Sequence, residues 1–366
     1  MAFMVICLHV QLFYSNEWSL SNGLLDVFVI YLCKVICPVA VPMFFFISGY
    51  LFFKGLENWN YELWKGKMIK RVRTLLIPYF LWTLIAILAF PVIRLGGALL
   101  NGSPIDDVWA VVEDRGFIRL FWDRTLFDGN IQNTTYMLGW RVPCGQPTNT
   151  PMWFVRDLMV VLLFSPLIHK LIDKGKFAFI ILLAGLYIVN IWIPISGFSI
   201  RSVFFFSWGA YYSLHGFYIV ESFRKIKWPI GLLFILGLSL IPMFWSNNSV
   251  FPILVRLFTI VSLVFVFNVA SYLIEKEKVA VNANLARSSF FVYCSHMVII
   301  ISVVMWVVMA LPFHSGLMQT LLFIAATILV YAICHCIYLF MNKFMPKVLA
   351  VLTGGRAVTA KKTIDK

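Results

Sequence analysis

Long hydrophobic runs, separated by short polar stretches, follow one another along almost the whole chain. A helix needs about 20 apolar residues to cross the hydrocarbon core of a bilayer, which is about 30 Å thick. Counted on this basis, the pattern predicts an all-α polytopic membrane protein with about ten transmembrane helices in one bundle. The predicted spans are residues 1–15, 25–53, 72–94, 152–172, 177–195, 198–218, 228–245, 250–274, 289–311 and 317–342.

The second predicted span is irregular. It is longer than a bilayer requires and contains the charged residues Asp26 and Lys34 and the prolines Pro38 and Pro42. Proline removes a helical hydrogen bond, and an overlong apolar segment must tilt or kink to fit the bilayer. We therefore expect this span to begin at the membrane interface and to kink before residue 41.

The first predicted span is too short to cross a bilayer. At about 1.5 Å per residue, Met1 to Tyr14 extends only about 21 Å, about 9 Å less than the hydrocarbon core. A signal peptide does not explain the short run, because no basic residue precedes it and no small-x-small cleavage site follows. We expect the natural protein to carry further apolar residues before Met1, preceded by a basic cytoplasmic flank.

The composition agrees with a membrane protein and excludes an ordinary soluble domain. Hydrophobic residues make up 61% of the chain and charged residues 13%, with a mean hydropathy of +0.88, whereas soluble domains carry about 25% charged residues. Six of the seven cysteines fall in apolar segments, so we expect no disulfide framework. We also expect no metal site, because Cys334, His335 and Cys336 are adjacent helical positions that point in different directions.

The distribution of Lys and Arg predicts the topology. More than two thirds of the 30 basic residues lie in alternate connections and after the last span, whereas the connections at 196–197, 246–249 and 312–316 contain none. Because cytoplasmic loops are enriched in Lys and Arg, we expect both termini in the cytoplasm. This bias accounts for the net charge of +14 without nucleic acid. The basic connection at 54–73, with Lys70 and Arg71, is explained by topology alone or by additional contacts to the phosphates of an anionic cosubstrate.

One connection, at about 95–151, is long, and the alternation places it outside. Its middle part, 106–124, mixes aromatic residues with paired charges, which is typical of a helix in the membrane interface. Loops of this length are usually functional or disordered, and the aromatic content favours an ordered cover over a site. We expect one transmembrane domain over residues 1–353 and a short basic cytoplasmic tail at 354–366.

Three arginines stand near the beginnings of predicted spans that run inward. They are Arg156, which is followed by Asp157, together with Arg201 and Arg256, and the topology places them at a similar depth near the outer surface. A single arginine there would snorkel to the interface and stabilise packing. Three on different helices at one level, with an acid beside one of them, indicate the lining of a polar cavity that binds substrate or donor.

Two of the histidines within predicted spans, His9 and His296, are candidates for chemistry. His9 falls in the outer half of the first span, and His296, about seven residues into an outward-running span, falls in the inner half. An intramembrane histidine indicates a functional site, although a hydrogen bond between helices is the simpler explanation. A neutral imidazole can take the proton of a hydroxyl as that hydroxyl attacks a thioester, and arginines can hold phosphates or developing negative charge. We expect His9 to act directly and His296 to be supportive.

Other motifs of soluble enzymes are missing from the sequence. It contains no Gly-rich phosphate loop, no zinc-ligand spacing and no Gly-x-Ser-x-Gly nucleophile elbow. Their absence removes most soluble-enzyme chemistries but leaves acyl transfer.

Several segments in this order resemble the integral-membrane acyltransferase family 3, which includes O-acetyltransferases of bacterial surface polysaccharides. Each motif is short, and the specificity comes from their order together with ten spans over nearly the whole chain. The segments are the first helix with His9, Val41-Pro-Met-Phe-Phe-Phe-Ile-Ser-Gly-Tyr50, Lys70-Arg71 followed by Ile77-Pro-Tyr-Phe-Leu-Trp82, Met152-Trp-Phe-Val-Arg-Asp-Leu158, and Ser289-Phe-Phe-Val-Tyr-Cys-Ser-His296.

The resemblance implies a ten-helix enzyme of the bacterial inner (cytoplasmic) membrane. Such an enzyme takes an acyl group from acyl-CoA, as a cosubstrate with no further bound cofactor, and transfers it to a hydroxyl of a glycan. The resemblance also implies that His9 is essential. Members of the family pair this histidine with an arginine a little under a dozen residues upstream, at a position before Met1 in this chain.

The sequence therefore predicts a membrane O-acyltransferase, with acetyl as the expected group, that acts on a cell-envelope carbohydrate or exopolysaccharide. The expected partners are membrane lipid, a carbohydrate acceptor and acyl-CoA. The main alternative is a transporter or flippase for a glycan or lipid precursor, but such proteins often carry internal repeats with broken helices at corresponding positions, and no such pair is visible. A scaffold without chemistry would leave the buried arginines unexplained.

Overall fold

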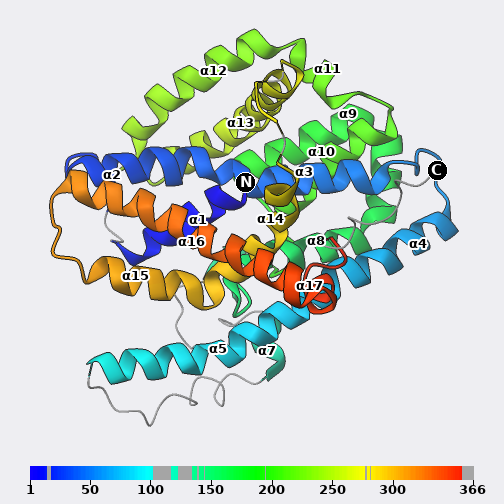
Figure 1. Ribbon diagram of the computed structural model, residues 1–366. Helices are drawn as coiled ribbons and strands as arrows, with labels where there is room; N and C mark the ends of the chain where they lie inside the picture. The colour runs from blue at the N-terminus through cyan, green and yellow to red at the C-terminus, as the bar shows by residue number, and fades with distance from the viewer. Residues whose placement is uncertain are drawn as a thin grey trace.

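The fold is a bundle of helices, many of which run across the view of Figure 1, whereas α14 (Ala283–Ser295) crosses them steeply. The connection that contains α4 (Tyr61–Arg71) lies at one end of this bundle, and the turn between α15 (Ile301–Met309) and α16 (Gly316–Phe344) lies at the other. The computed structural model describes residues 1–14, 18–101, 117–122, 134–137, 140–143, 145–193, 195–276, 278–280 and 282–356.

Helices account for nearly all elements of the described chain, with one small antiparallel hairpin. The first part contains α1 (Ala2–Val10), α2 (Leu24–Val29), α3 (Ala40–Phe53), α4, α5 (Ile77–Asn101), α7 (Phe117–Trp122), β1 (Thr134–Met137) and β2 (Trp140–Pro143). The second part contains α8 (Trp153–Leu163), α9 (Ser165–Val189), α10 (Ile200–Leu214), α11 (Ile219–Arg224), α12 (Lys227–Leu240), α13 (Val250–Glu275), α14 (Ala283–Ser295), α15, α16 and α17 (Pro346–Leu352).

The predicted all-α polytopic membrane fold is confirmed. Among the described residues, six helical runs are long and apolar enough to cross a membrane, and Ala2–Phe13 forms a shorter apolar helix. The other predicted spans are helical but shorter or broken, so the count of ten is not established. For example, the predicted span 152–172 is divided at Phe164, where α8 ends and α9 begins, and α9 itself bends at Lys176, whose φ is +46°.

Helix boundaries differ from the hydropathy pattern in the first half of the chain. α5 continues to Asn101 although it contains Pro91, so the helix extends seven residues beyond the predicted end at residue 94. Of the expected interfacial helix at 106–124, only Phe117–Trp122 lies within the described residues, and it is helical. Most of the tail predicted at 354–366 also falls outside the described part, which ends at residue 356.

The irregularity expected in the second span lies at and before Pro38, whereas Pro42 lies within α3. The helical run Leu24–Phe53 continues through a π-helical segment, Ile30–Ile36, and a 3-10 turn, Cys37–Val39, before regular α-helix resumes in α3. Proline has no backbone N–H, so Pro38 cannot make the regular α-helical hydrogen bond. The run therefore accommodates Pro38 by a change in helical winding.

Two glycines bring α3 and α10 into close contact at the centre of the core. A Cβ atom on Gly49 of α3 would overlap the backbone carbonyl of Phe206, and one on Gly209 of α10 would overlap the carbonyl of Phe46. Small residues at membrane helix interfaces allow backbones to approach in this way. The reciprocal arrangement fixes α10, and with it the arginine near its beginning, against α3.

We expect Gly49→Ala and Gly209→Ala each to destabilise the protein by at least about 2 kcal/mol, because a backbone carbonyl cannot move aside as a side chain can. The midpoint of thermal unfolding of the purified protein in detergent should fall by about 2–3 °C or more. Gly185→Ala in α9 is the matched control, because its Cβ would meet no atom within 4 Å. Equal midpoints for the three variants would contradict the close contact.

Candidate active site

Two histidines meet inside the bundle. His9 lies on α1, which packs against α3, α14 and α16. His296 begins the π-helical turn His296–Ile300, which joins α14 to α15. The centroids of the two imidazole rings are 5.3 Å apart. Both intramembrane histidines singled out by the sequence therefore belong to one place in the fold.

The predicted depths of these histidines are wrong in one respect. The sequence pattern placed His9 in the outer half of the membrane and His296 in the inner half, but rings in contact must lie at a similar depth. The helical run of His296 extends from Ala283 to Met309, so it begins six residues before the predicted span at 289. His296 is the fourteenth of its 27 residues and stands at the middle of the run.

Hydrogen bonding fixes the tautomer of His296. Its Nδ1 lies 3.0 Å from the carbonyl oxygen of Val292, and because a carbonyl can only accept, Nδ1 carries the proton. The Nε2 of the neutral ring then has a free lone pair. Among the described residues, neither this Nε2 nor the Nδ1 of His9 has a hydrogen-bond partner, although both are enclosed. Buried polar atoms are rarely left unpaired unless they have a functional role.

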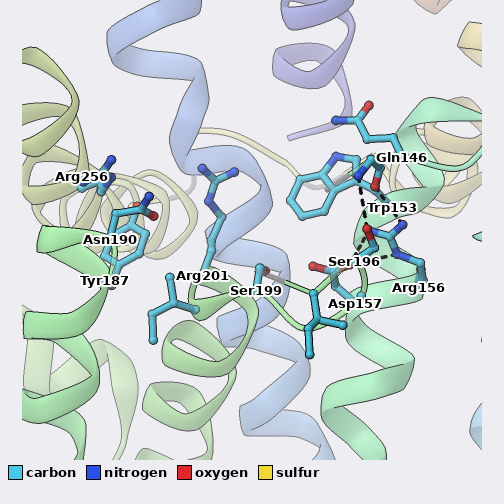
Figure 2. Close-up of a pocket in the computed structure, with 14 residues that line it drawn as sticks. Gln146, Trp153, Arg156, Asp157, Tyr187, Asn190, Ser196, Ser199, Arg201 and Arg256 are labelled. Atoms are coloured by element: carbon cyan, nitrogen blue, oxygen red, sulfur yellow. Dashed lines mark hydrogen bonds and ion pairs between the residues drawn. The ribbon is translucent and has the colours of Figure 1, made fainter. Parts of the chain in front are cut away.

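The three predicted arginines line one cavity of about 280 Å³ (Figure 2). Arg156 and Asp157 come from α8, Arg201 from the first turn of α10, and Arg256 from the second turn of α13. The other lining residues include aromatic, amide and hydroxyl side chains, namely Trp153, Tyr187, Asn190, Gln146, Ser196 and Ser199. Their convergence in one polar cavity is as the topology predicted, and their binding role stays a prediction.

Within this cavity, Arg156 and Asp157 form a buried pair. The two residues are 3% and 2% exposed, and both the Nε and one terminal nitrogen of Arg156 donate to the same carboxylate oxygen, at 3.2 and 3.1 Å. Arg156 also donates to the carbonyls of Gly145 and Trp122. Because a buried charge is tolerated when it is paired and hydrogen-bonded, this arginine is held by the protein itself.

A second cavity, of about 240 Å³, contains a different pair of arginines. Arg71, at the end of α4, and Arg356, after α17, both line it, together with Ser289 and Tyr293 of α14. Arg356 lies over the ring of Phe290, with its guanidinium carbon 3.9 Å from the ring centroid. Burial lowers the pKa of this guanidinium below its ordinary value, but arginine remains charged at any physiological pH.

The basic connection predicted at 54–73 contains α4, and its cations have different surroundings. Lys67 donates to the carbonyls of Phe52 and Lys54 and so closes the end of α3. Lys70 is exposed and is not among the residues that line the second cavity, whereas Arg71 lines it. Of Lys70 and Arg71, therefore, only Arg71 lines this cavity, and contact with an anionic cosubstrate stays a prediction.

The short turn before α8 contacts α14, the helix that leads to His296. Asn149 donates to the carbonyl of Cys294 at 3.0 Å, and the hydroxyl of Tyr293 donates to the carbonyl of Pro151. The ring of Tyr293 also lies 6.3 Å from that of His296. Tyr293 lines the second cavity as well, so the histidine pair is adjacent to the cavity that contains Arg71 and Arg356.

Comparison with known proteins identifies the family of this chain. The family model described as an acyltransferase domain matches residues 1–340. The chain belongs to this acyltransferase family. A curated relative, the succinoglycan biosynthesis protein ExoH of Rhizobium meliloti (strain 1021), is 28% identical over 367 aligned residues, covering 96% of this chain and 89% of the relative. No solved structure gives a significant match.

In this multi-pass membrane acyltransferase, the residues singled out from the sequence did not include Arg356, which lines the second cavity. That residue was assigned to a tail because it follows the last apolar helix. Gly354 and Gly355 both adopt positive φ values, +62° and +81°, and turn the chain back so that Arg356 donates to the carbonyl of Thr74. Two adjacent glycines before an isolated arginine are the only signal in the sequence for this turn.

Proposed function

We propose that the protein transfers an acetyl group from acetyl-CoA to a hydroxyl of an exopolysaccharide or another cell-envelope carbohydrate. The observation that carries this proposal is the pair of His9 and His296, each with an enclosed and unpartnered nitrogen among the described residues, within a chain of the acyltransferase family. The relative named for succinoglycan biosynthesis supports a carbohydrate acceptor. Proton transfer by a positioned imidazole is the chemistry that such a transfer requires.

In the proposed mechanism, His9 is the general base. It takes the proton of the acceptor hydroxyl as the hydroxyl oxygen attacks the thioester carbonyl, which forms the new C–O bond. The tetrahedral intermediate then expels CoA by breaking the C–S bond, and the thiolate receives the proton from His9. His296 acts as a positioning residue, because its Nε2 lone pair can accept a hydrogen bond from an N–H of His9.

The second cavity is the proposed donor site. Its two arginines, Arg71 and Arg356, match the phosphates of CoA, since a guanidinium binds phosphate with two parallel hydrogen bonds. Its position beside Tyr293, which is adjacent to His296, supports passage of the thioester toward the histidine pair. The bias of Lys and Arg supports a cytoplasmic location for this end of the bundle, where acyl-CoA is made, and both termini in the cytoplasm.

This orientation also supports a division of the substrates between the two faces of the bacterial inner membrane. The first cavity lies at the beginnings of α10 and α13, next to connections that contain no Lys or Arg. The carbohydrate acceptor would enter from this outer face, and acetyl-CoA from the inner face. The acetyl group then needs to cross only the part of the membrane that the histidine pair occupies.

The test is a transfer assay with the purified protein in detergent or vesicles. Given acetyl-CoA and an exopolysaccharide oligosaccharide, the protein should release free CoA and form an alkali-labile acetyl ester on the carbohydrate. Release should depend on both substrates. Movement of a labelled glycan across a vesicle membrane, without CoA release under any of these conditions, would support the transporter alternative and contradict the proposal.

A further inference from the structure

The first cavity carries more positive charge than its acidic lining balances. Its ionisable side chains within the described residues are Arg156, Asp157, Arg201, Arg256 and Tyr187. Asp157 is bound to Arg156, as described above. The described lining offers no second carboxylate for Arg201 or Arg256. Asp157 is thus the single carboxylate among three guanidinium groups in the described lining, and this excess of positive charge favours an anionic ligand.

The two remaining arginines have donors to spare. Arg201 is exposed to the cavity, and its guanidinium lies over the ring of Trp153, 5.8 Å from the centroid. Arg256 uses one terminal nitrogen to donate to the carbonyl of Ile188 at 2.7 Å. A guanidinium has five N–H donors, so most of those on Arg256 remain for a ligand. Figure 2 shows Arg201 between Arg256 and Asn190 on one side and Trp153 with the Arg156–Asp157 pair on the other.

The beginning of α10 adds a further attraction for negative charge. This helix has 15 residues, and Ser199 and Ile200 at its start line the same cavity as Arg201. The first N–H groups of a helix carry a partial positive charge and commonly bind anions. Here they add to a cluster of charged side chains, which is the main element of the site.

The cavity is also distinct from the place of the acyl transfer step. Neither His9 nor His296 is among its lining residues. Asn149 and Pro151, in the turn before α8, contact Cys294 and Tyr293 and are not among the cavity's lining residues either. A group bound by Arg201 and Arg256 is therefore a remote part of a substrate, and such contacts orient the reacting group elsewhere in the molecule.

We propose that this cavity is a subsite for an acidic group of the acceptor glycan, either a carboxylate on a sugar or a phosphate that links the glycan to its lipid carrier. This inference rests on the proposed function, because it assumes that the acceptor enters at this end of the bundle. A carboxylate and a phosphate each present two oxygens that a guanidinium can bind through two parallel hydrogen bonds. The subsite makes the enzyme selective for acidic or carrier-linked acceptors.

The experiment uses Arg201→Gln and Arg256→Gln in the full chain, with acetyl-CoA and three acceptors. These are an oligosaccharide with a uronic acid, its neutral counterpart, and the neutral oligosaccharide linked through diphosphate to a polyprenol. Each variant should raise the KM for the acceptor that carries the recognised acid by about 10- to 100-fold, as expected for a lost charge-assisted hydrogen bond. The KM for acetyl-CoA and the KM for the neutral acceptor should stay the same. Lys225→Gln, an exposed charge between α11 and α12, is the control.

The three acceptors distinguish the two sources of the acid. A change confined to the uronic-acid oligosaccharide identifies a carboxylate on the sugar, and one confined to the diphosphate-linked acceptor identifies the carrier phosphate. Equal changes for all three acceptors, or a raised KM for acetyl-CoA in place of the acceptor, would overturn the proposal.

Direct binding separates this inference from the proposed catalytic function. Calorimetric titration of the purified protein with each acceptor, in the absence of acetyl-CoA, measures the subsite without any turnover. Wild-type protein should bind the recognised acidic acceptor at least tenfold more tightly than the neutral one, and Arg201→Gln should remove most of this difference. Preferential binding without acyl transfer would refute the proposed function alone. Transfer with no preference in binding would refute the anionic subsite alone.

Discussion

Replacing His9 with alanine is expected to abolish acyl transfer while leaving the protein folded. A positioned general base contributes about 10²- to 10⁴-fold to the rate of proton transfer, and the described residues around His9 supply only one other imidazole, His296. The initial rate of CoA release, measured at saturating acetyl-CoA and acceptor, should fall by about 10³-fold. The elution volume and thermal midpoint of the variant in detergent should match those of the wild type.

His314→Ala is the matched control, because His314 is exposed in the turn between α15 and α16 and should have no effect. His296→Ala should lower kcat by about tenfold and leave the KM for acetyl-CoA unchanged, as a positioning residue would. His296→Gln should recover part of the rate, since an amide can both donate to the carbonyl of Val292 and accept from His9. Normal transfer by His9→Ala would refute the assignment of the base.

The hydrophobic pattern was sufficient to predict the class of fold, but not the number of helices long enough to span a membrane. It was not sufficient to predict where helices begin, because hydropathy identifies residues that tolerate hydrocarbon and not residues that are helical. The polar stretch Ala283–Ser288 is part of α14, yet the pattern excluded it from the span. This error displaced His296 from the middle of its helix to the inner half.

The charge alternation predicted the convergence of the three arginines because these residues occupy equivalent positions in their helices. Arg156, Arg201 and Arg256 each stand near the beginning of a helix that the charge alternation directs the same way, so errors in the helix ends had little influence. Their convergence in one cavity follows from this common depth. The sequence could not predict which of these arginines is bound by protein groups. Only the structure shows Asp157 and two backbone carbonyls holding Arg156.

The position of Arg356 could not be predicted from the neighbouring sequence. Its contacts, with Phe290 and with the carbonyls of Thr74 and Thr353, include partners that are far away in the sequence. No hydrophobic period or charge pattern near residue 356 encodes such a contact. A cavity built from α4, α14 and the segment after α17 becomes visible only when these parts of the chain are folded together.

Replacing Arg71 or Arg356 with glutamine is expected to raise the KM for acetyl-CoA by about 10- to 100-fold, because each change removes a charge-assisted contact to phosphate of about 1.5–3 kcal/mol. The kcat at saturating acetyl-CoA and the KM for the acceptor should change little. Lys65→Gln is the matched control, since Lys65 is an exposed cation on α4 that is not among the residues lining the cavity.

A donor without nucleotide phosphates tests directly whether Arg71 and Arg356 bind the phosphates of acetyl-CoA. Acetyl-pantetheine carries the same thioester but lacks the groups that the arginines are expected to bind. Its KM should therefore be the same for wild type, Arg71→Gln and Arg356→Gln, and its turnover shows that each variant is folded. Because Arg356 also binds the carbonyls of Thr74 and Thr353, a purely structural role would lower turnover of both donors equally. That outcome would remove the second cavity as the donor site and leave the histidine pair without an identified source of acetyl groups.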